Sequence, residues 1–299
     1  SRGLGDVYKR QGMTVMLAVA FISCEKVELP STNNEKPQED GVSICFTISN
    51  IEQVAFDNGM VNTRAAITDL CSRITFAFFQ DDEKIKQVSQ KASDDGFGNL
   101  TVSLPSGSYK FVVLAHNGTD NPTVTSLDKI TFGNNGKLAD TFYYYGELDA
   151  TESKDVNLSL KRVVAMVRFI ITDAIPADVK KMKFEYTGGS SSLNATTGLG
   201  CVKSQQEETF TVEEAAHTGQ SQYEIYTIPH ATDGTLKLTV KALMNDDEEY
   251  KKQTFEDVPV TINKITKYTG KFFENTQKPG EIKISLQTDD EWTETEISY

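Results

Sequence analysis

Hydrophobic and polar side chains alternate along much of the chain, with the period of two that is typical of strands with one buried face. The first alternating segment spans residues 42–48. Its apolar face consists of Val42, Ile44, Phe46 and Ile48. A denser apolar run at residues 74–79 predicts a second strand that is more deeply buried.

Segments of the same kind recur to the end of the chain, separated by short clusters of Gly, Asn, Asp, Pro and Ser. Only residues 178–181 and 213–216 could form a turn or two of helix. The pattern therefore predicts an all-β fold built from β-sandwiches. The remaining expected strands are 100–104, 109–116, 141–148, 156–160, 163–171, 182–186, 223–228, 236–243, 258–262, 268–273 and 281–286.

The pattern restarts at Lys161-Arg162, directly after the expected strand that ends at Leu160. With 299 residues the chain is longer than a usual domain of ~100–200 residues. We therefore predict two β-sandwich domains in tandem, an N-terminal one at residues 41–160 and a C-terminal one at residues 161–299.

The first part of the chain has the features of a leader. The apolar stretch from Met13 to Ile22 has the length of a signal-peptide core and is too short to span a bilayer. It ends at Ser23-Cys24, a small residue before a cysteine, as in the signals of bacterial lipoproteins. We predict that Cys24 carries acyl chains such as palmitate. The alternative is a buried strand that holds an ordinary cysteine.

The segments on either side of this stretch do not belong to the predicted fold. Residues 1–11 look like a non-native lead-in, so residues 1–24 comprise that lead-in and the signal peptide. Residues 25–40 are rich in Glu, Asn, Pro and Ser, which predicts a solvated tether. An acylated Cys24 followed by such a tether predicts a surface-exposed lipoprotein of the cell outer membrane.

The charge of the chain excludes one class of partner. The net charge is −13 and the apolar fraction is 38%. An acidic chain repels phosphate backbones, because nucleic-acid affinity depends mainly on Lys and Arg. We therefore expect a folded protein that does not bind nucleic acid.

The sequence offers little chemistry for catalysis or metal binding. It contains no C-x-x-C pair, no H-E-x-x-H motif, no phosphate loop and no G-x-S-x-G motif. We expect no enzyme activity, no metal and no cofactor. His116 and His230 are candidate general bases, but we interpret both as solvated loop residues. If Cys24 is acylated, Cys45, Cys71 and Cys201 remain, and a Cys45–Cys71 disulfide is one open possibility.

Acidic and aromatic clusters are the other candidates. The carboxylates at 81–83, 94–95 and 246–249 lack the spacing of a calcium loop, and we interpret them as solubilising turns. Trp292 could contact a glycan or protein, although we favour an anchor for the chain end. The Tyr143-Tyr144-Tyr145-Gly146 run is a candidate platform that we interpret as part of a strand.

Several local motifs occur together, in one order, over nearly the whole chain after Cys24. With them the sequence resembles the FimB-like fimbrial anchor and fimbrillin proteins of Bacteroidetes, the type V pilin group. Besides the lipoprotein signal, the motifs are Thr63-Arg64-Ala65, the turn Leu104-Pro105-Ser106-Gly107-Ser108-Tyr109, the aromatic strand at 142–146, and Leu160-Lys161-Arg162-Val163.

The resemblance implies a fold and a role. The fold is two transthyretin-like Greek-key sandwiches, and the role is a structural one in fimbria assembly and cell adhesion. In that family a protease that cuts after Arg removes the first strand, and a strand of another fimbrial subunit replaces it. By analogy Arg64 is the candidate cleavage site and Val42, Ile44, Phe46 and Ile48 form the displaced strand.

The resemblance leaves three questions open. A strand with Ile282, Ile284 and Leu286 on one face is either a donor strand or the last strand of its own domain. The protein is either an anchor at the base of a fimbrium or a stalk or tip subunit. The alternative function is that of a surface glycan-binding lipoprotein, which recognises a host or bacterial surface ligand through exposed aromatic side chains.

Overall fold

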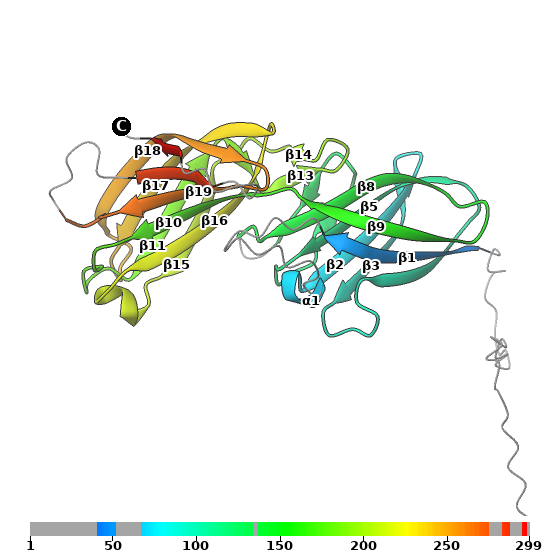
Figure 1. Cartoon of the computed structure of the whole chain (residues 1–299), viewed down its shortest axis with the longest axis horizontal. Helices are drawn as coiled ribbons and strands as arrows, with labels where there is room; N and C mark the ends of the chain where they lie inside the picture. The colour runs from blue at the N-terminus through cyan, green and yellow to red at the C-terminus, as the bar shows by residue number, and fades with distance from the viewer. Residues whose placement is uncertain (1–40, 52–66, 134–136, 275–282, 288–294, 298–299) are drawn as a thin grey trace, which may run out of the picture. The chain divides into compact units, whose positions relative to one another are not determined.

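The computed structural model describes residues 41–51, 67–133, 137–274, 283–287 and 295–297. Nearly all of the regular secondary structure among the described residues is strand (Figure 1), so the predicted all-β class is confirmed. Several predictions fall outside these residues: the acylation of Cys24, the tether, cleavage at Arg64, and the roles of Ile282 and Trp292. No described helix is long and apolar enough to cross a membrane.

The first half of the chain forms a seven-stranded sheet in the order β3-β2-β5-β8-β9-β1-β4. Strands β8 and β9 pair through only two residue pairs, Phe142 with Arg162 and Tyr143 with Lys161. Side chains on both sides of this short joint enter one core, so the sheet forms the two layers of a sandwich. The strands are β1 (Val42–Ile51), β2 (Arg73–Gln80), β3 (Glu83–Lys91), β4 (Asn99–Leu104), β5 (Ser108–His116), β8 (Thr141–Asp149) and β9 (Lys154–Arg162).

The second half forms two sheets around a second core, in the orders β12-β16-β10-β19-β20-β21 and β15-β11-β17-β18. The strands of the first are β10 (Ala165–Ile171), β12 (Gly189–Ser190), β16 (Ser221–Pro229), β19 (Ile265–Gly270), β20 (Lys283–Gln287) and β21 (Thr295–Ile297). The strands of the second are β11 (Lys181–Thr187), β15 (Gln206–Thr211), β17 (Asp233–Leu243) and β18 (Glu249–Thr261).

A small sheet in the order β14-β13-β7-β6 joins the two halves. Its central pair is β7 (Ile130–Thr131) with β13 (Ser192–Asn194), flanked by β6 (Thr123–Val124) and β14 (Leu199–Gly200). A third core cluster lies here and includes Phe79 and Leu114 from the first half and Leu193 and Ile228 from the second.

Arg162 adds a polar contact to this junction. Its side chain donates to both carboxylate oxygens of Asp140, at 2.7 and 2.9 Å, and to the side-chain oxygen of Asn263 at 2.8 Å. Asn263 lies in the turn between β18 and β19, about 100 residues away in sequence. The predicted boundary at Leu160 stays a prediction, because the described residues from Gly41 onward form one compact unit.

Most predicted strands are confirmed within a few residues, and the helical turn at 213–216 corresponds to the 3₁₀ helix η1 (Glu214–His217). The only α-helix among the described residues, α1 (Ile67–Leu70), was not predicted. The suggestion of helix at 178–181 is wrong, because β11 begins at Lys181. Strands β3 and β15 were missed, since their polar sequences, EKIKQVSQK and QEETFT, show no regular apolar face.

Candidate functional site

Strand β1 lies inside a sheet rather than at its edge. It runs parallel to β9, where Ile44 pairs with Lys154 and Ile51 pairs with Leu160. On its other side it runs antiparallel to β4, where Val42 pairs with Leu104 and Thr47 pairs with Asn99. The first strand of the sandwich is therefore bordered by backbone on both sides (Figure 1).

The inner face of β1 supplies part of the first core. Ile44 and Phe46 are fully buried, and Val42 and Ile48 are partly buried against the same core. The ring of Phe46 lies 5.3–5.9 Å, between centroids, from the rings of Phe76, Phe78 and Phe111. A fully buried side chain of this size contributes about 1.5–3 kcal/mol, so β1 stabilises the sandwich chiefly through Ile44 and Phe46.

The outer face of β1 carries small polar groups. Cys45 Sγ lies 3.4 Å from Thr101 Oγ1, directly across on β4. Near the other end of the strand, Ser49 Oγ donates to the carbonyl of Leu158, and Asn50 Nδ2 donates to Ser159 Oγ. These contacts help to fix the register of β1, because each one joins specific partners on β4 or β9.

Strand β4 depends on β1 for its backbone pairing. Within the described residues β1 is the only strand that pairs with it, and its far edge is met by side chains of β3. Lys86 Nζ donates to the carbonyl of Ser103 at 3.1 Å, and Gln90 Nε2 donates to the carbonyl of Asn99 at 2.6 Å. These side chains cover an edge that would otherwise be open to another strand.

The turn Leu104–Tyr109 has a clear structural role. Tyr109 OH donates to the carbonyl of Pro105 at 2.8 Å, which closes the turn. The backbone of Gly107 exchanges hydrogen bonds with Ala150 in the β8–β9 connection, at 2.8 and 3.4 Å. The turn therefore links the end of β4 to the start of β5 and holds the β8–β9 connection beside it.

The candidate donor segment is paired within the chain. Strand β20 runs antiparallel to β19, with Ile284 opposite Tyr268 and Leu286 opposite Thr266, and β21 pairs with its other edge. This arrangement is the alternative that the sequence left open, a strand of its own domain. Donation of this segment to another subunit stays a prediction.

The interpretation of His116 as a solvated loop residue is wrong. His116 is the last residue of β5, is only 1% exposed, and packs edge-on against Phe132 with the ring centroids 5.7 Å apart. Its Nδ1 accepts the backbone N–H of Gly118 at 3.0 Å, and its Nε2 is buried with no hydrogen-bond partner among the described residues. Burial, assisted by the charge of Arg73, lowers the pKa of His116 to about 4.

His230 is partly buried as well, and its Nδ1 lies 2.8 Å from the carbonyl of Gly200. The structure therefore gives neither His116 nor His230 a nucleophile or a carboxylate among the contacts described. The three cysteines within the described residues, Cys45, Cys71 and Cys201, are free thiols, so the open possibility of a Cys45–Cys71 disulfide is not realised. Burial raises the pKa of Cys71 to about 12.

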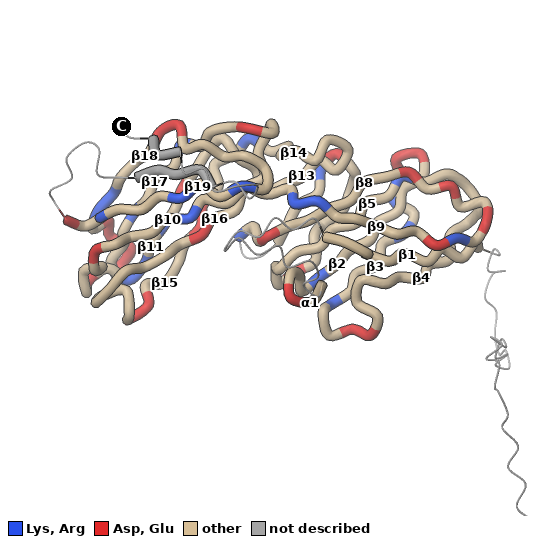
Figure 2. Tube along the Cα trace, viewed as in Figure 1, with Lys and Arg blue, Asp and Glu red and all other residues tan. Residues whose placement is uncertain are grey.

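The acidic and aromatic candidates can be placed in the same way. Asp81 and Asp82 form the β2–β3 turn, and no group of acidic, His or Cys side chains within the described ranges is arranged to hold a metal ion. Acidic and basic residues are interspersed along the described strands (Figure 2). Tyr144 packs against the first core, with its ring centroid 5.4 Å from that of Phe111, while Tyr143 and Tyr145 pack against the third.

Comparison with known proteins identifies one family. The family of fimbrillin-A associated anchor proteins Mfa1 and Mfa2 matches residues 35–298 of the chain. No curated protein sequence matches this chain.

Among solved structures, a candidate polysaccharide-binding protein from Bacteroides thetaiotaomicron has 11% identity and a TM-score of 0.51, covering 82% of this chain and 95% of that one. The fimbrial anchor protein Mfa2 from Porphyromonas gingivalis has 12% identity and a TM-score of 0.48, covering 87% and 100%. A fimbrial assembly protein from Parabacteroides distasonis has 13% identity and a TM-score of 0.44, covering 86% and 98%. At 11% identity, the likeness to the first of these shows a common fold.

Proposed function

Because this chain belongs to the family of fimbrillin-A associated anchor proteins, we propose that it is a fimbrial anchor or subunit that joins other subunits by β-strand complementation. The family is one of fimbrial and adhesin structural proteins, which supports a position at the cell surface and an association with fimbrial components. The proposal includes acylation of Cys24 and attachment of the chain to the outer membrane. Both are proposals because residues 1–40 lie outside the described residues.

The observation that supports strand complementation is the position of β1. It is the first strand of the fold, it is bordered by backbone on both sides, and it inserts Ile44 and Phe46 into a core. A foreign strand in its place gains ladder hydrogen bonds from β9 and β4 and apolar contacts from the core. β-Strand addition of this kind obtains affinity from the backbone and specificity from alternate side chains.

A single substitution tests whether β1 must leave its place. Cys45 and Thr101 face each other across β1 and β4, with Sγ and Oγ1 3.4 Å apart, so Thr101→Cys brings two thiols into disulfide range. We expect the oxidised variant to be unable to exchange β1 and therefore not to incorporate a second subunit. Incorporation is measured by co-purification with fimbriae from cells that express the variant.

Two controls keep this experiment specific. Thr101→Ser preserves the position without a cross-link and should assemble as the unmodified chain does, and reduction of the Thr101→Cys disulfide should restore assembly. If the oxidised variant assembles as efficiently as Thr101→Ser, β1 stays in place during assembly, as it would in an anchor, and replacement of β1 is the wrong mechanism for this chain.

The choice between anchor and polymerising subunit rests on processing. Intact-mass analysis of the protein recovered from outer membranes gives the mature N-terminus directly. An acylated Cys24 at the N-terminus indicates an anchor that retains β1. An N-terminus at Ala65 indicates cleavage after Arg64 and a subunit that polymerises.

A glycan-binding role through aromatic platforms has less support, since Tyr144 packs on a core and Trp292 lies outside the described residues. A glycan array with Trp292→Ala and Tyr144→Ala variants separates this role from assembly. We expect neither substitution to abolish binding to a glycan. Loss of a specific glycan signal in either variant would favour the aromatic-platform role.

A further inference from the structure

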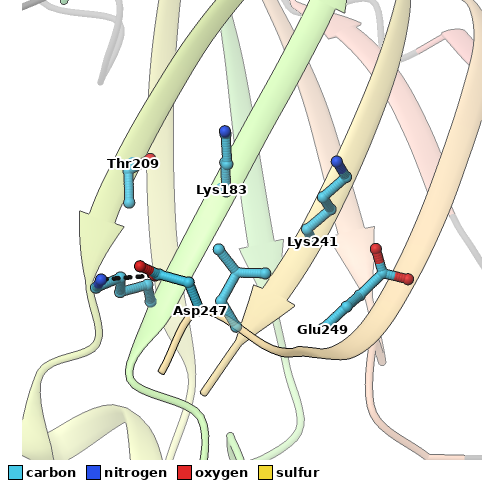
Figure 3. Close-up of a pocket in the computed structure, with 7 residues that line it drawn as sticks. Lys183, Thr209, Lys241, Asp247 and Glu249 are labelled. Atoms are coloured by element: carbon cyan, nitrogen blue, oxygen red, sulfur yellow. Dashed lines mark hydrogen bonds and ion pairs between the residues drawn. The ribbon is translucent and has the colours of Figure 1, made fainter. Parts of the chain in front are cut away.

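The outer face of the sheet β15-β11-β17-β18 carries an open pocket of about 500 Å³. We call it the lysine pocket and define it by Lys181, Lys183, Thr209, Lys241, Asp247 and Glu249. Figure 3 shows Lys183 and Lys241 on neighbouring strands, between Thr209 on one side and Glu249 on the other. The pocket lies far from β1 in sequence and on a different sheet.

A row of like charges crosses this face. Lys183 on β11 pairs directly with Lys241 on β17, and Lys241 pairs directly with Lys252 on β18. Like charges directly opposite each other destabilise a sheet. The chain as a whole is acidic, with a net charge of −13, so a row of three facing lysines is unusual for it. The mutual repulsion of these lysines does not stabilise the sheet.

Neighbouring carboxylates offset part of this repulsion. Lys241 Nζ lies 2.8 Å from Glu185, and Lys183 Nζ lies 3.4 Å from Glu185 and 2.9 Å from Glu207. The hydrogen bond from Lys241 lowers the pKa of Glu185, and the one to Glu207 raises the pKa of Lys183. An ammonium has three donors. Each lysine therefore keeps at least one N–H beyond these described contacts for a further acceptor.

Two carboxylates that line the pocket offer acceptors. Asp247 forms an ion pair with Lys181 at 2.6 Å, and its side chain is still 64% exposed. Glu249 also lines the pocket and lies on the far side of Lys241 in Figure 3. Thr209 adds a hydroxyl that both donates and accepts. The pocket thus combines ammonium donors with carboxylate and hydroxyl acceptors.

From this arrangement we propose that the lysine pocket binds an acidic sugar residue of a glycan. The carboxylate or sulfate of the sugar accepts hydrogen bonds from Lys183 and Lys241, and its hydroxyls donate to Asp247 and Glu249. An acidic peptide fits less well, because its side chains bring negative charge without the hydroxyl donors that Asp247 and Glu249 can accept. This site is independent of the proposed strand complementation.

The proposal is tested with trigalacturonic acid as the probe, titrated calorimetrically into the whole chain at an ionic strength of about 10 mM, where screening is weak. We expect saturable binding that weakens as salt is raised. The Lys183→Met/Lys241→Met double variant should lose affinity by about tenfold or more. Thermal unfolding of each variant confirms that the fold is retained.

Matched controls identify the chemistry of the site. Lys237 lies on β17, as Lys241 does, but forms an ion pair with Glu256 outside the pocket. Lys237→Met should therefore leave the affinity for trigalacturonic acid unchanged. Glu249→Leu should weaken binding if this carboxylate accepts hydrogen bonds from sugar hydroxyls. It should tighten binding if the pocket only attracts anions, because a repelling charge is removed. Galactotriose, which is neutral, should not bind.

Four results would each overturn the assignment: no saturable binding of trigalacturonic acid, unchanged affinity in the double lysine variant, tighter binding in Glu249→Leu, or equal binding of hexaglutamate. The last of these would identify an acidic-peptide site instead. Because the chain's assembly with other subunits is measured by the Thr101→Cys experiment, failure of one proposal leaves the other intact.

Discussion

At the scale of single residues, two buried titratable groups make stability depend on pH. The pKa of His116 is about 4 in the folded chain, against an ordinary value of 6.5. The pKa of Glu208, which is 4% exposed, is raised by burial to about 8 from an ordinary 4.5. Between pH 4.5 and 6.5 a rise in pH stabilises the folded chain through His116 and destabilises it through Glu208. Substitution of each residue is therefore needed to separate the two effects.

For His116 the unfolded chain binds the proton more tightly. The stability that the neutral ring contributes is complete above pH 6.5 and is lost as the pH falls towards 4, by up to ~3 kcal/mol. We expect His116→Leu to remove this loss, although it also removes the acceptor for Gly118. Urea unfolding at pH 7 and pH 5 measures the difference. A variant as acid-sensitive as the unmodified chain would contradict the prediction, and His217→Gln is the control.

For Glu208 the folded chain binds the proton more tightly. Its contribution is complete below pH 4.5 and is lost as the pH rises towards 8, since the carboxylate must then ionise in a buried site beside Tyr186. We expect Glu208→Gln to flatten this decline between pH 5 and 8 in urea unfolding. Glu207→Gln, on the exposed face of the same strand, should leave the decline in place.

Loss of Arg162 should destabilise the chain strongly. Its side chain is 4% exposed and holds both Asp140 and Asn263. Substitution by Met leaves the carboxylate of Asp140 buried without this partner, and breaking a buried pair costs about 3–5 kcal/mol. Chemical denaturation measures the loss. Lys110→Met, at an exposed ion pair with Asp82, should leave the stability nearly unchanged.

At the scale of elements, the β2–β3 hairpin shows what a polar sequence can still form. Asp81 and Asp82 both have positive φ, 48° and 64°, as a two-residue type I′ turn requires. We expect Asp81→Asn/Asp82→Gly to stabilise the chain by about 0.5–1 kcal/mol, because Asn-Gly adopts this turn with less strain. Thermal unfolding measures the change in stability. An unchanged or lower unfolding temperature would indicate that loss of the Lys110–Asp82 contact outweighs the relief of backbone strain.

The same hairpin shows where sequence patterns fail. Strand β2 was predictable because residues 74–79 are all buried, and β1 because its alternation matches its burial. Strand β3 was not, since it is exposed along most of its length and is held by backbone pairing to β2 and by side-chain bonds to β4. An edge strand that buries no side chains leaves no periodic signal in the sequence.

Some residues of the candidate site could be predicted from the sequence, and others could not. The apolar face of β1 could be identified from alternation, whereas its parallel pairing with β9 depends on contacts between residues far apart in sequence. His116 was misinterpreted because its burial comes from Phe132, which lies beyond the strand. The lysine row was invisible, since only the register of three strands brings Lys183, Lys241 and Lys252 together.

At the scale of the whole molecule, the junction determines whether the two halves unfold together. Leu193 is fully buried in the third core, in a strand that pairs with β7 of the other half. We expect the unmodified chain to unfold in one calorimetric transition and Leu193→Asp to split it into two, because a buried charge disrupts this core. Leu199→Asp, in the partly exposed β14, is the control, and a single transition in both variants would contradict the prediction.

The parallel pairing of β1 with β9 also has a consequence for the order of events during synthesis. Ile44 cannot meet its partner Lys154 until about 110 further residues have been made, which takes roughly 6–20 s at ordinary rates of translation. For that interval the apolar segment that becomes β1 lacks β9, one of its two native neighbours. Chaperones that hold extended polypeptides therefore have a time window in which to bind it.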